Sequence, residues 1–313
     1  MERRRKVEAE FRLLKLAGLD ATCYTDQMSS RNLFIATLFI AVSFASIRSA
    51  AAASCVWKVT SPDGHSLYLG GSSHFLRPTD YPLPPQYNVA FDACSQLVFE
   101  DDPNTGPAAF QALLKAGQYP KGDGLKNHVD PRTYEYVRRF FALRRVSEDK
   151  FARFRPWLID ILLSSPPPQF YQLGVEQFLT RRALANSKRI SGLESTREHN
   201  EVFTGLSDRQ AEALLLTLFI NAGREDGRGV NMFEAWRRGD VELLASKMRE
   251  SFRDFPSMAE RLLDTRNRVW VPKIENLCRS GRTAFVVVGA AHLGGPNGLL
   301  ALLRARGYTA EQL

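Results

Sequence analysis

The chain has 313 residues, of which 44% are hydrophobic and 24% are charged, and its formal net charge at pH 7 is +8. A chain of this size and composition can bury a large core, which excludes an intrinsically disordered or fibrous protein. The basic side chains lie on predicted helical faces without the interleaved aromatic residues of a nucleic-acid-binding surface, so we expect no nucleic-acid partner.

Residues 33–47 form an uncharged apolar stretch, which follows Arg31 and precedes the small-residue run SAAAAS. This layout is typical of a secretory signal peptide, because the apolar stretch is shorter than the roughly 20 residues that cross a bilayer. We predict a signal peptide at 28–54, a true start at Met28 and an upstream segment 1–27 outside the mature protein. The mature chain, 55–313, is then exported to the periplasm or secreted.

Three cysteines remain after this cleavage, and in an oxidising compartment each thiol needs an explanation. Cys55 follows a sequence that loosely resembles a lipoprotein box, so membrane attachment through a lipid on Cys55 is one alternative. Cys94 and Cys278 each end a predicted helix before a strand, and a disulfide between them is another. The sequence does not decide between free thiols and a bridge.

The mature chain begins with a predicted β-hairpin, whose strands are Cys55–Thr60 and Ser66–Gly70 on either side of a Ser-Pro-Asp-Gly turn. A helix at 86–94 and a buried strand, Gln96–Glu100, follow. Strand-helix-strand order implies parallel pairing and brings the strand ends to one edge of a sheet. We therefore expect Glu100 and His74 to share that edge.

The stretch 107–185 has a helical pattern with breaks at Pro131, Pro156 and 166–168, and its aromatic residues are expected to form core. A short strand, Arg189–Glu194, is followed by more helix over 197–280. The chain closes with the predicted strand Thr283–Val288, a helix Asn297–Arg306 capped by Gly307, and the strand Tyr308–Gln312. The predicted fold is a single α/β domain. Its mixed central sheet is assembled from the N- and C-terminal segments, with a helix-rich middle insertion at about 107–280.

Two apolar segments end in the same pattern, Gly-x-x-His: SLYLGGSSH at 66–74 and TAFVVVGAAH at 283–292. Gly71 and Gly289 allow a sharp turn or close backbone approach, and His74 and His292 follow where each strand ends. Folding is expected to place both imidazoles in one crevice beyond the strand ends. The other histidines, His65, His128 and His199, are predicted to be surface residues. The alternative is that both corners merely terminate strands.

Two neutral imidazoles and one carboxylate form a typical ligand set for a catalytic divalent metal. We predict that His74, Glu100 and His292 hold Mn²⁺, Co²⁺, Zn²⁺ or Fe²⁺, which lowers the pKa of a bound water. Glu194 is the candidate general base or ligand-orienting residue. Two alternatives stay open: Glu194 caps the helix that begins near Thr196, and His74 pairs with Glu100 to act on water without a metal. No Gly-x-Ser-x-Gly motif supports a serine nucleophile.

In these residues the chain resembles the TraB/PrgY/GumN family, which includes the Tiki-like proteins. The likeness runs through VWKVTSPDGHSLYLGGSSH, YPLP, LVFE, GVEQFL, ISGLE, TRNRVWVPKIENL and FVVVGAAHLGGPNGLLALLRARGY, in this order. It implies the α/β fold of erythromycin-esterase-like and ChaN-like proteins, and a site built from Gly71, His74, Glu100, Gly289 and His292. The family pattern also implies roles for Glu194, and for Arg266 and Asn267 as substrate-orienting or supporting groups.

The resemblance to Tiki-like members implies a divalent-metal-dependent protease with a peptide or protein substrate. Glu176 stands where the family more often has Asp. Gly71 stands where the esterase-like relatives have an acid, which favours metal binding over the esterase mechanism. We therefore expect an exported metal-dependent hydrolase, most simply a peptidase. The alternative is a non-catalytic protein that binds a peptide, a signalling molecule or haem in the same crevice.

Overall fold

The computed structural model describes residues 53–102, 106–165, 173–222 and 232–313. The predicted upstream segment 1–27, almost all of the predicted signal peptide and the predicted break at 166–168 lie outside the described residues. Among the helices that are described, none is both long enough and apolar enough to cross a membrane.

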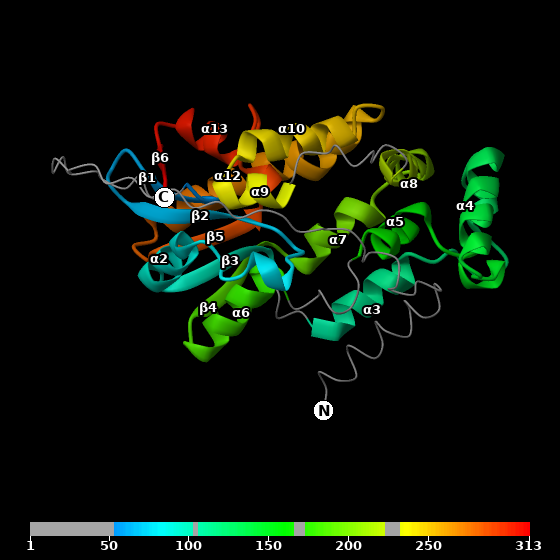
Figure 1. Cartoon of the computed structure of the whole chain (residues 1–313), viewed down its shortest axis with the longest axis horizontal. Coiled ribbons are helices and arrows are strands. Elements are labelled where there is room, and N and C mark those ends of the chain that lie inside the picture. The colour runs from blue at the N-terminus through cyan, green and yellow to red at the C-terminus, as the bar shows by residue number, and fades with distance from the viewer. Residues whose placement is uncertain (1–52, 103–105, 166–172, 223–231) are drawn as a thin grey trace, which may run out of the picture.

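A six-stranded mixed sheet forms the centre of the protein, in the order β4-β3-β5-β2-β1-β6 (Figure 1). The strands β2, β5, β3 and β4 run parallel to one another, whereas β1 pairs antiparallel with both β2 and β6. The strands are β1 (Val56–Thr60), β2 (Ser66–Ser72), β3 (Gln96–Asp101), β4 (Arg189–Glu194), β5 (Ala284–Gly289) and β6 (Thr309–Gln312).

The sheet confirms the predicted mixed α/β architecture, in which the N-terminal strands interleave with the C-terminal ones. Strand β5 lies between β3 and β2, and its run AFVVV is fully buried, as expected of a parallel strand that is covered on both faces. Strand β4 comes from the middle of the chain and is the edge strand next to β3.

Helices cover both faces of the sheet, with α10, α12 and α13 along one face and α2 and α6 along the other (Figure 1). Their side chains form one hydrophobic core with the strands. The helices that accompany the sheet are α2 (Pro85–Ala93), α6 (Val175–Ala185), α9 (Met232–Arg238), α10 (Val241–Ser251), α12 (Thr265–Arg279) and α13 (Leu299–Arg304), with the short turns η1 (Pro78–Asp80) and η7 (Ala290–His292).

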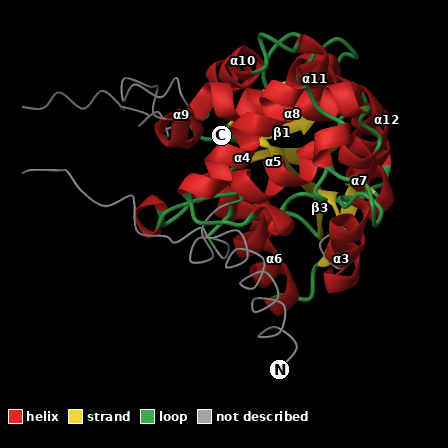
Figure 2. Cartoon of the chain, turned by 90° about the vertical axis from the view of Figure 1, so that its right-hand side faces the viewer, coloured by secondary structure: helices red, strands yellow, loops and turns green. Residues whose placement is uncertain are grey.

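The middle of the chain forms a helical layer beside the sheet, and Figure 2 shows several of its helices in front of the strands. It has two smaller cores of its own, and Trp157 and Phe141 are buried in them as predicted. Pro131 and Pro156 each occupy the first helical position, so they begin helices. This layer comprises α3 (Gly106–Ala116), α4 (Pro131–Leu143), α5 (Pro156–Ser164), α7 (Thr196–Thr204), α8 (Asp208–Ala222) and α11 (Pro256–Ala259), with η3 (Leu125–Asn127), η4 (Glu148–Lys150) and the π-helical turn η6 (Glu260–Asp264).

Two expectations need correction. The last helix is shorter than the predicted Asn297–Arg306, because α13 spans only Leu299–Arg304.

The three described cysteines are free and buried, so there is no bridge between Cys94 and Cys278. The Cys94 thiol donates to the carbonyl of Phe91 and the Cys278 thiol to that of His65. Cys55 lies fully buried in the core, so a lipid on its thiol would displace the start of β1.

The first Gly-x-x-His corner leaves no room for a side chain at Gly71. A Cβ atom there would stand 2.9 Å from the Cβ of Ala290 and 3.0 Å from its Cα, both in the second corner. We predict that Gly71→Ala lowers the free energy of unfolding by about 1–3 kcal/mol, because backbone must move to accept the methyl group. Urea denaturation measures this loss. Ser73→Ala, at a half-buried neighbouring position, is the control and should change stability by less than about 0.5 kcal/mol.

Candidate functional site

The parallel strands deliver both histidine corners to the same edge of the sheet. Strands β2 and β5 are direct neighbours, and Ser72 lies opposite Gly289 in their register. The two corners therefore come from adjacent strands. Glu100 at the end of β3 and Glu194 at the end of β4 follow along the same edge, because β3 pairs with both β5 and β4.

His292 is held as a neutral imidazole with a defined tautomer. Its Nδ1 lies 2.7 Å from Oδ1 of Asn267, while the Asn267 amide nitrogen donates to the carbonyls of His292 and Asn297. The amide oxygen must then be an acceptor, so the imidazole proton lies on Nδ1 and the lone pair on Nε2. Burial lowers the pKa of His292 to about 4. This side chain is therefore uncharged at neutral pH and presents a basic nitrogen.

The Nε2 atom of His292 faces a charged cluster. It lies 3.8 Å from Oε1 of Glu100 and 3.4 Å from Nη1 of Arg266. Trp270 packs against the imidazole, with ring centroids 4.6 Å apart, and excludes water from that side. A proton on Nε2 would be attracted by the Glu100 carboxylate and repelled by the Arg266 guanidinium, and burial keeps the pKa of His292 low overall.

Arg266, at the start of α12, clamps the carboxylates of two strands. Its Nη2 lies 2.6 Å from Oε2 of Glu100, and its Nε lies 3.0 Å from Oε1 of Glu194. Trp270 lies under the guanidinium at 4.5 Å and donates its indole N–H to Glu194. The Trp270 ring therefore covers one face of the guanidinium, and the carboxylates of Glu100 and Glu194 hold its edges.

These contacts keep both carboxylates ionised inside the protein. Burial opposes the charge on Glu100, but Arg266, His292, His74 and the N–H of Gly289 together hold its pKa well below the ordinary value. Burial also opposes the charge on Glu194, whose pKa is nevertheless lowered to about 2 by His199 and Arg266. Glu100, Glu194 and Arg266 therefore all stay charged over the physiological pH range.

The carboxylate partner of His74 is Glu176 in the first turn of α6. Nδ1 of His74 lies 2.9 Å from Oε1 of Glu176, and the hydroxyl of Ser72 donates to the same oxygen at 2.5 Å. This corrects the alternative in which His74 pairs with Glu100. The reason is that Gly174 lets α6 approach the first corner, since a Cβ there would stand 2.5 Å from the carbonyl oxygen of His74.

Glu176 makes His74 a cation. The negative charge of Glu176 raises the pKa of His74 to about 9, which is opposite to the shift of His292. Because 60% of the His74 side chain is exposed, water screens the pair, and it orients the ring more than it stabilises the fold. Sequence reasoning noted Glu176 in GVEQFL but assigned it no role in the site.

His199 is the second residue that sequence reasoning missed, since it was predicted to lie at the surface. Its Nδ1 lies 3.3 Å from Nη2 of Arg266 and 3.4 Å from Oε2 of Glu194, and 31% of its side chain is exposed. The helical cap that was an alternative for Glu194 is provided by Ser195, which forms a capping box with Glu198. Glu194 therefore does not cap the helix, and its carboxylate contacts Arg266, Trp270 and His199 instead.

The predicted metal ligands have suitable chemistry but are not arranged around one point. Both Nδ1 atoms are held by acceptors, as is usual for metal-ligating histidines. Within the described ranges, however, no three His, Cys, Asp or Glu side chains are placed to hold an ion. Arg266 already occupies Glu100 with a positive charge, and His74 is protonated next to Glu176. The arrangement shown does not fit a divalent ion, so metal binding stays a prediction.

Comparison with known proteins gives one family. The model of the TraB/PrgY/gumN family matches residues 55–312. No curated protein matches the chain.

The opposite pKa shifts of the two histidines can be measured directly. We predict that the His292 ring shows the neutral Nδ1–H tautomer in ¹⁵N NMR spectra down to about pH 4, whereas His74 stays protonated above its ordinary pKa of about 6.5. If His74 and His292 both titrated near the ordinary histidine pKa of about 6.5, this assignment would be contradicted.

Proposed function

The chain belongs to the TraB/PrgY/gumN family, and from that premise and the geometry of its two histidines we propose that it is a hydrolase. The observation that carries the proposal is the pair of imidazoles at one sheet edge with opposite pKa shifts. Groups whose surroundings push their pKa values apart supply an acid and a base at the same pH. We propose a peptidase, with a peptide or protein substrate, because the sequence resembles Tiki-like members.

In this proposal His292 is the general base. Its Nε2 accepts a proton from water, and the water oxygen attacks the carbonyl carbon of the scissile amide. The charge that develops on His292 is stabilised by Glu100, 3.8 Å away. Arg266 keeps Glu100 ionised and oriented, and Asn267 keeps the proton of the resting imidazole on Nδ1.

His74 is the general acid. Protonated next to Glu176, it donates a proton to the amide nitrogen as the carbon–nitrogen bond breaks, and Glu176 holds its ring in place. The side chain is exposed and thus accessible to a large substrate, whereas His292 is buried. Glu194 acts through Arg266 and is a positioning residue. The amine and the acid leave as products, His292 releases its proton to water, and His74 takes up a proton from water, which restores the resting state.

The two histidines set the predicted pH range of activity. The rate should rise as His292 loses its proton near pH 4 and fall as His74 loses its proton near pH 9. Glu176→Gln removes the charge that raises the pKa of His74, so the alkaline limb should move towards the ordinary value of about 6.5. The measurement is the pH profile of peptide-library cleavage.

Glu201→Gln is the matched control, because the Glu201 carboxylate pairs with Arg197 on the exposed side of α7. It should leave the profile unchanged. His292→Gln should abolish turnover without loss of the fold. If His292→Gln and Glu100→Gln both keep peptide binding and the parent shows no cleavage of any peptide, the chain is a binding protein.

Metal dependence is an alternative to this mechanism, because an ion bound to His74 would replace the proton that His74 donates. A divalent ion on His74, Glu100 and His292 would polarise the carbonyl and activate water, but it would need Glu100 to release Arg266 and His74 to lose its proton. This alternative predicts about one equivalent of Mn²⁺, Co²⁺, Zn²⁺ or Fe²⁺ by elemental analysis of the purified protein, lost in His74→Ala and His292→Ala. Equal metal content in parent and variants would overturn the metal site and leave the imidazole mechanism to be tested by its pH profile.

A further inference from the structure

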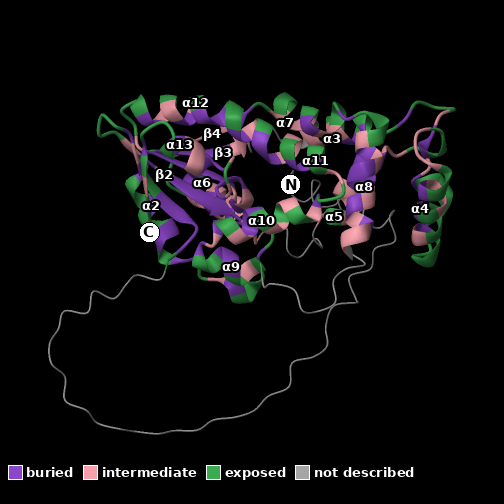
Figure 3. Cartoon of the chain, turned by 90° about the horizontal axis from the view of Figure 1, so that it is seen from above, coloured by how far each residue is buried: buried purple, intermediate pink, exposed green. Residues whose placement is uncertain are grey.

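Helix α4 stands at the end of the molecule farthest from the sheet (Figures 1 and 3). Exposed residues recur along it at intervals of three and four, so they share one face. This stripe consists of Arg132, Tyr136, Arg139 and Leu143. Leu143 is 84% exposed, the largest fraction among the exposed large hydrophobic side chains of the described residues, and Tyr136 is 50% exposed. The stripe is therefore apolar and basic at once.

The C-terminal end of α4 carries unneutralised positive charge. Arg138 and Arg139 share the carboxylate of Glu135, and the negative charge of Glu148 also acts on Arg138, so these four side chains sum to no net charge. The positive charge that remains is that of Arg144 and Arg145. Across the described part of the chain, neither Arg144 nor Arg145 pairs with a carboxylate. Arg144 lies over the ring of Phe140 at 3.6 Å and donates a hydrogen bond from Nη1 to the Phe140 carbonyl, without a carboxylate partner.

Arg145 occupies a backbone conformation that favours glycine. Its φ is +58°, and it ends α4 in a Schellman motif, in which the N–H of Val146 donates to Phe141 and that of Arg145 to Ala142. A β-carbon at this position costs stability that a glycine would not. The protein therefore tolerates this destabilisation at an exposed arginine close to Leu143.

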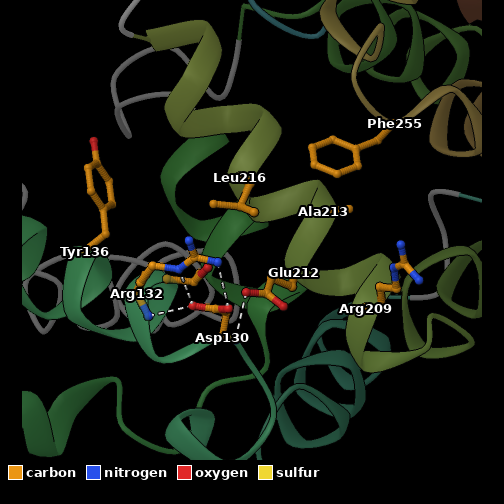
Figure 4. A pocket seen from close by; sticks show the side chains of 9 residues that line it. Asp130, Arg132, Tyr136, Arg209, Glu212, Ala213, Leu216 and Phe255 are labelled. Atoms are coloured by element: carbon orange, nitrogen blue, oxygen red, sulfur yellow. Dashed lines mark hydrogen bonds and ion pairs between the residues drawn. The ribbon is translucent and has the colours of Figure 1, made fainter.

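The other end of the stripe borders an apolar hollow of about 540 Å³ between α4 and α8. In Figure 4 Tyr136 stands at its rim, and Ala213, Leu216 and Phe255 line it. The guanidinium of Arg132 is turned towards Asp130, so it contributes no free charge. The free cations of α4 are thus confined to its protruding C-terminal end.

We propose that the α4 tip, defined as Tyr136, Arg139, Leu143, Arg144 and Arg145, docks on an anionic phospholipid surface. Leu143 and Tyr136 enter the headgroup region and the arginines bind phosphate groups, as in proteins that lie on a membrane without spanning it. Charge complementarity favours anionic lipid. A protruding helix end also suits a deformable bilayer better than the flat, matched surface of a protein partner.

The test is sedimentation of the whole protein with vesicles of phosphatidylcholine, with and without phosphatidylglycerol. The parent should bind only the anionic vesicles, and binding should weaken at high salt. Arg144→Gln and Arg145→Gly should each weaken binding about fivefold, and Leu143→Ser should weaken it at every salt concentration.

Arg145→Gly also separates binding from folding. It relieves the positive φ, so its melting temperature should rise by about 2–4 °C while its vesicle binding falls. Ser187→Gly is the matched control, because Ser187 also has a positive φ, +53°, and lies outside the tip. It should gain stability and keep its vesicle binding. A parent that ignores anionic vesicles at low salt, or an Arg144→Gln/Arg145→Gly double variant that binds like the parent, would overturn the proposal.

Discussion

The site depends on one buried interaction, the guanidinium of Arg266 between the carboxylates of Glu100 and Glu194. Those acids end two neighbouring parallel strands, where their like charges would otherwise repel each other in a nonpolar setting. Removing one partner of a buried ion pair typically costs about 3–5 kcal/mol, because the remaining charge is left uncompensated. These ion pairs therefore join the sheet edge to α12, and they also fix the positions of the charged groups next to His292.

The strands and the sheet edge could be predicted because their signals are local. An apolar run with β-branched residues predicts a buried strand, and Ala284–Gly289 was located almost to the residue. The edge strand Arg189–Glu194, which is buried only at Leu193 and Glu194, was also located. Parallel order then places the strand ends together without further information. Glu100, Glu194 and both histidine corners follow from this rule, and it holds however the helices pack.

Glu176 and His199 could not be predicted in the same way, because their roles depend on how helices dock. Glu176 begins a helix a hundred residues from His74, and only the contact through Gly174 brings its carboxylate to the first corner. His199 lies in a polar sequence that is typical of a surface helix, yet it reaches Arg266. The opposite charge states of His74 and His292 likewise come from tertiary surroundings, since their sequence contexts are nearly the same.

The π-helical turn η6 immediately precedes Arg266. Such a turn holds one residue more than the α-helix it interrupts, and each helical residue advances the side-chain direction by about 100°. Arg266 and Trp270 share one face of α12 because they are four residues apart, and the extra residue in η6 rotates that face relative to the helix before it. Without this residue the same face would turn towards different neighbours, so the electrostatics of the crevice depend on a local change in helical pitch.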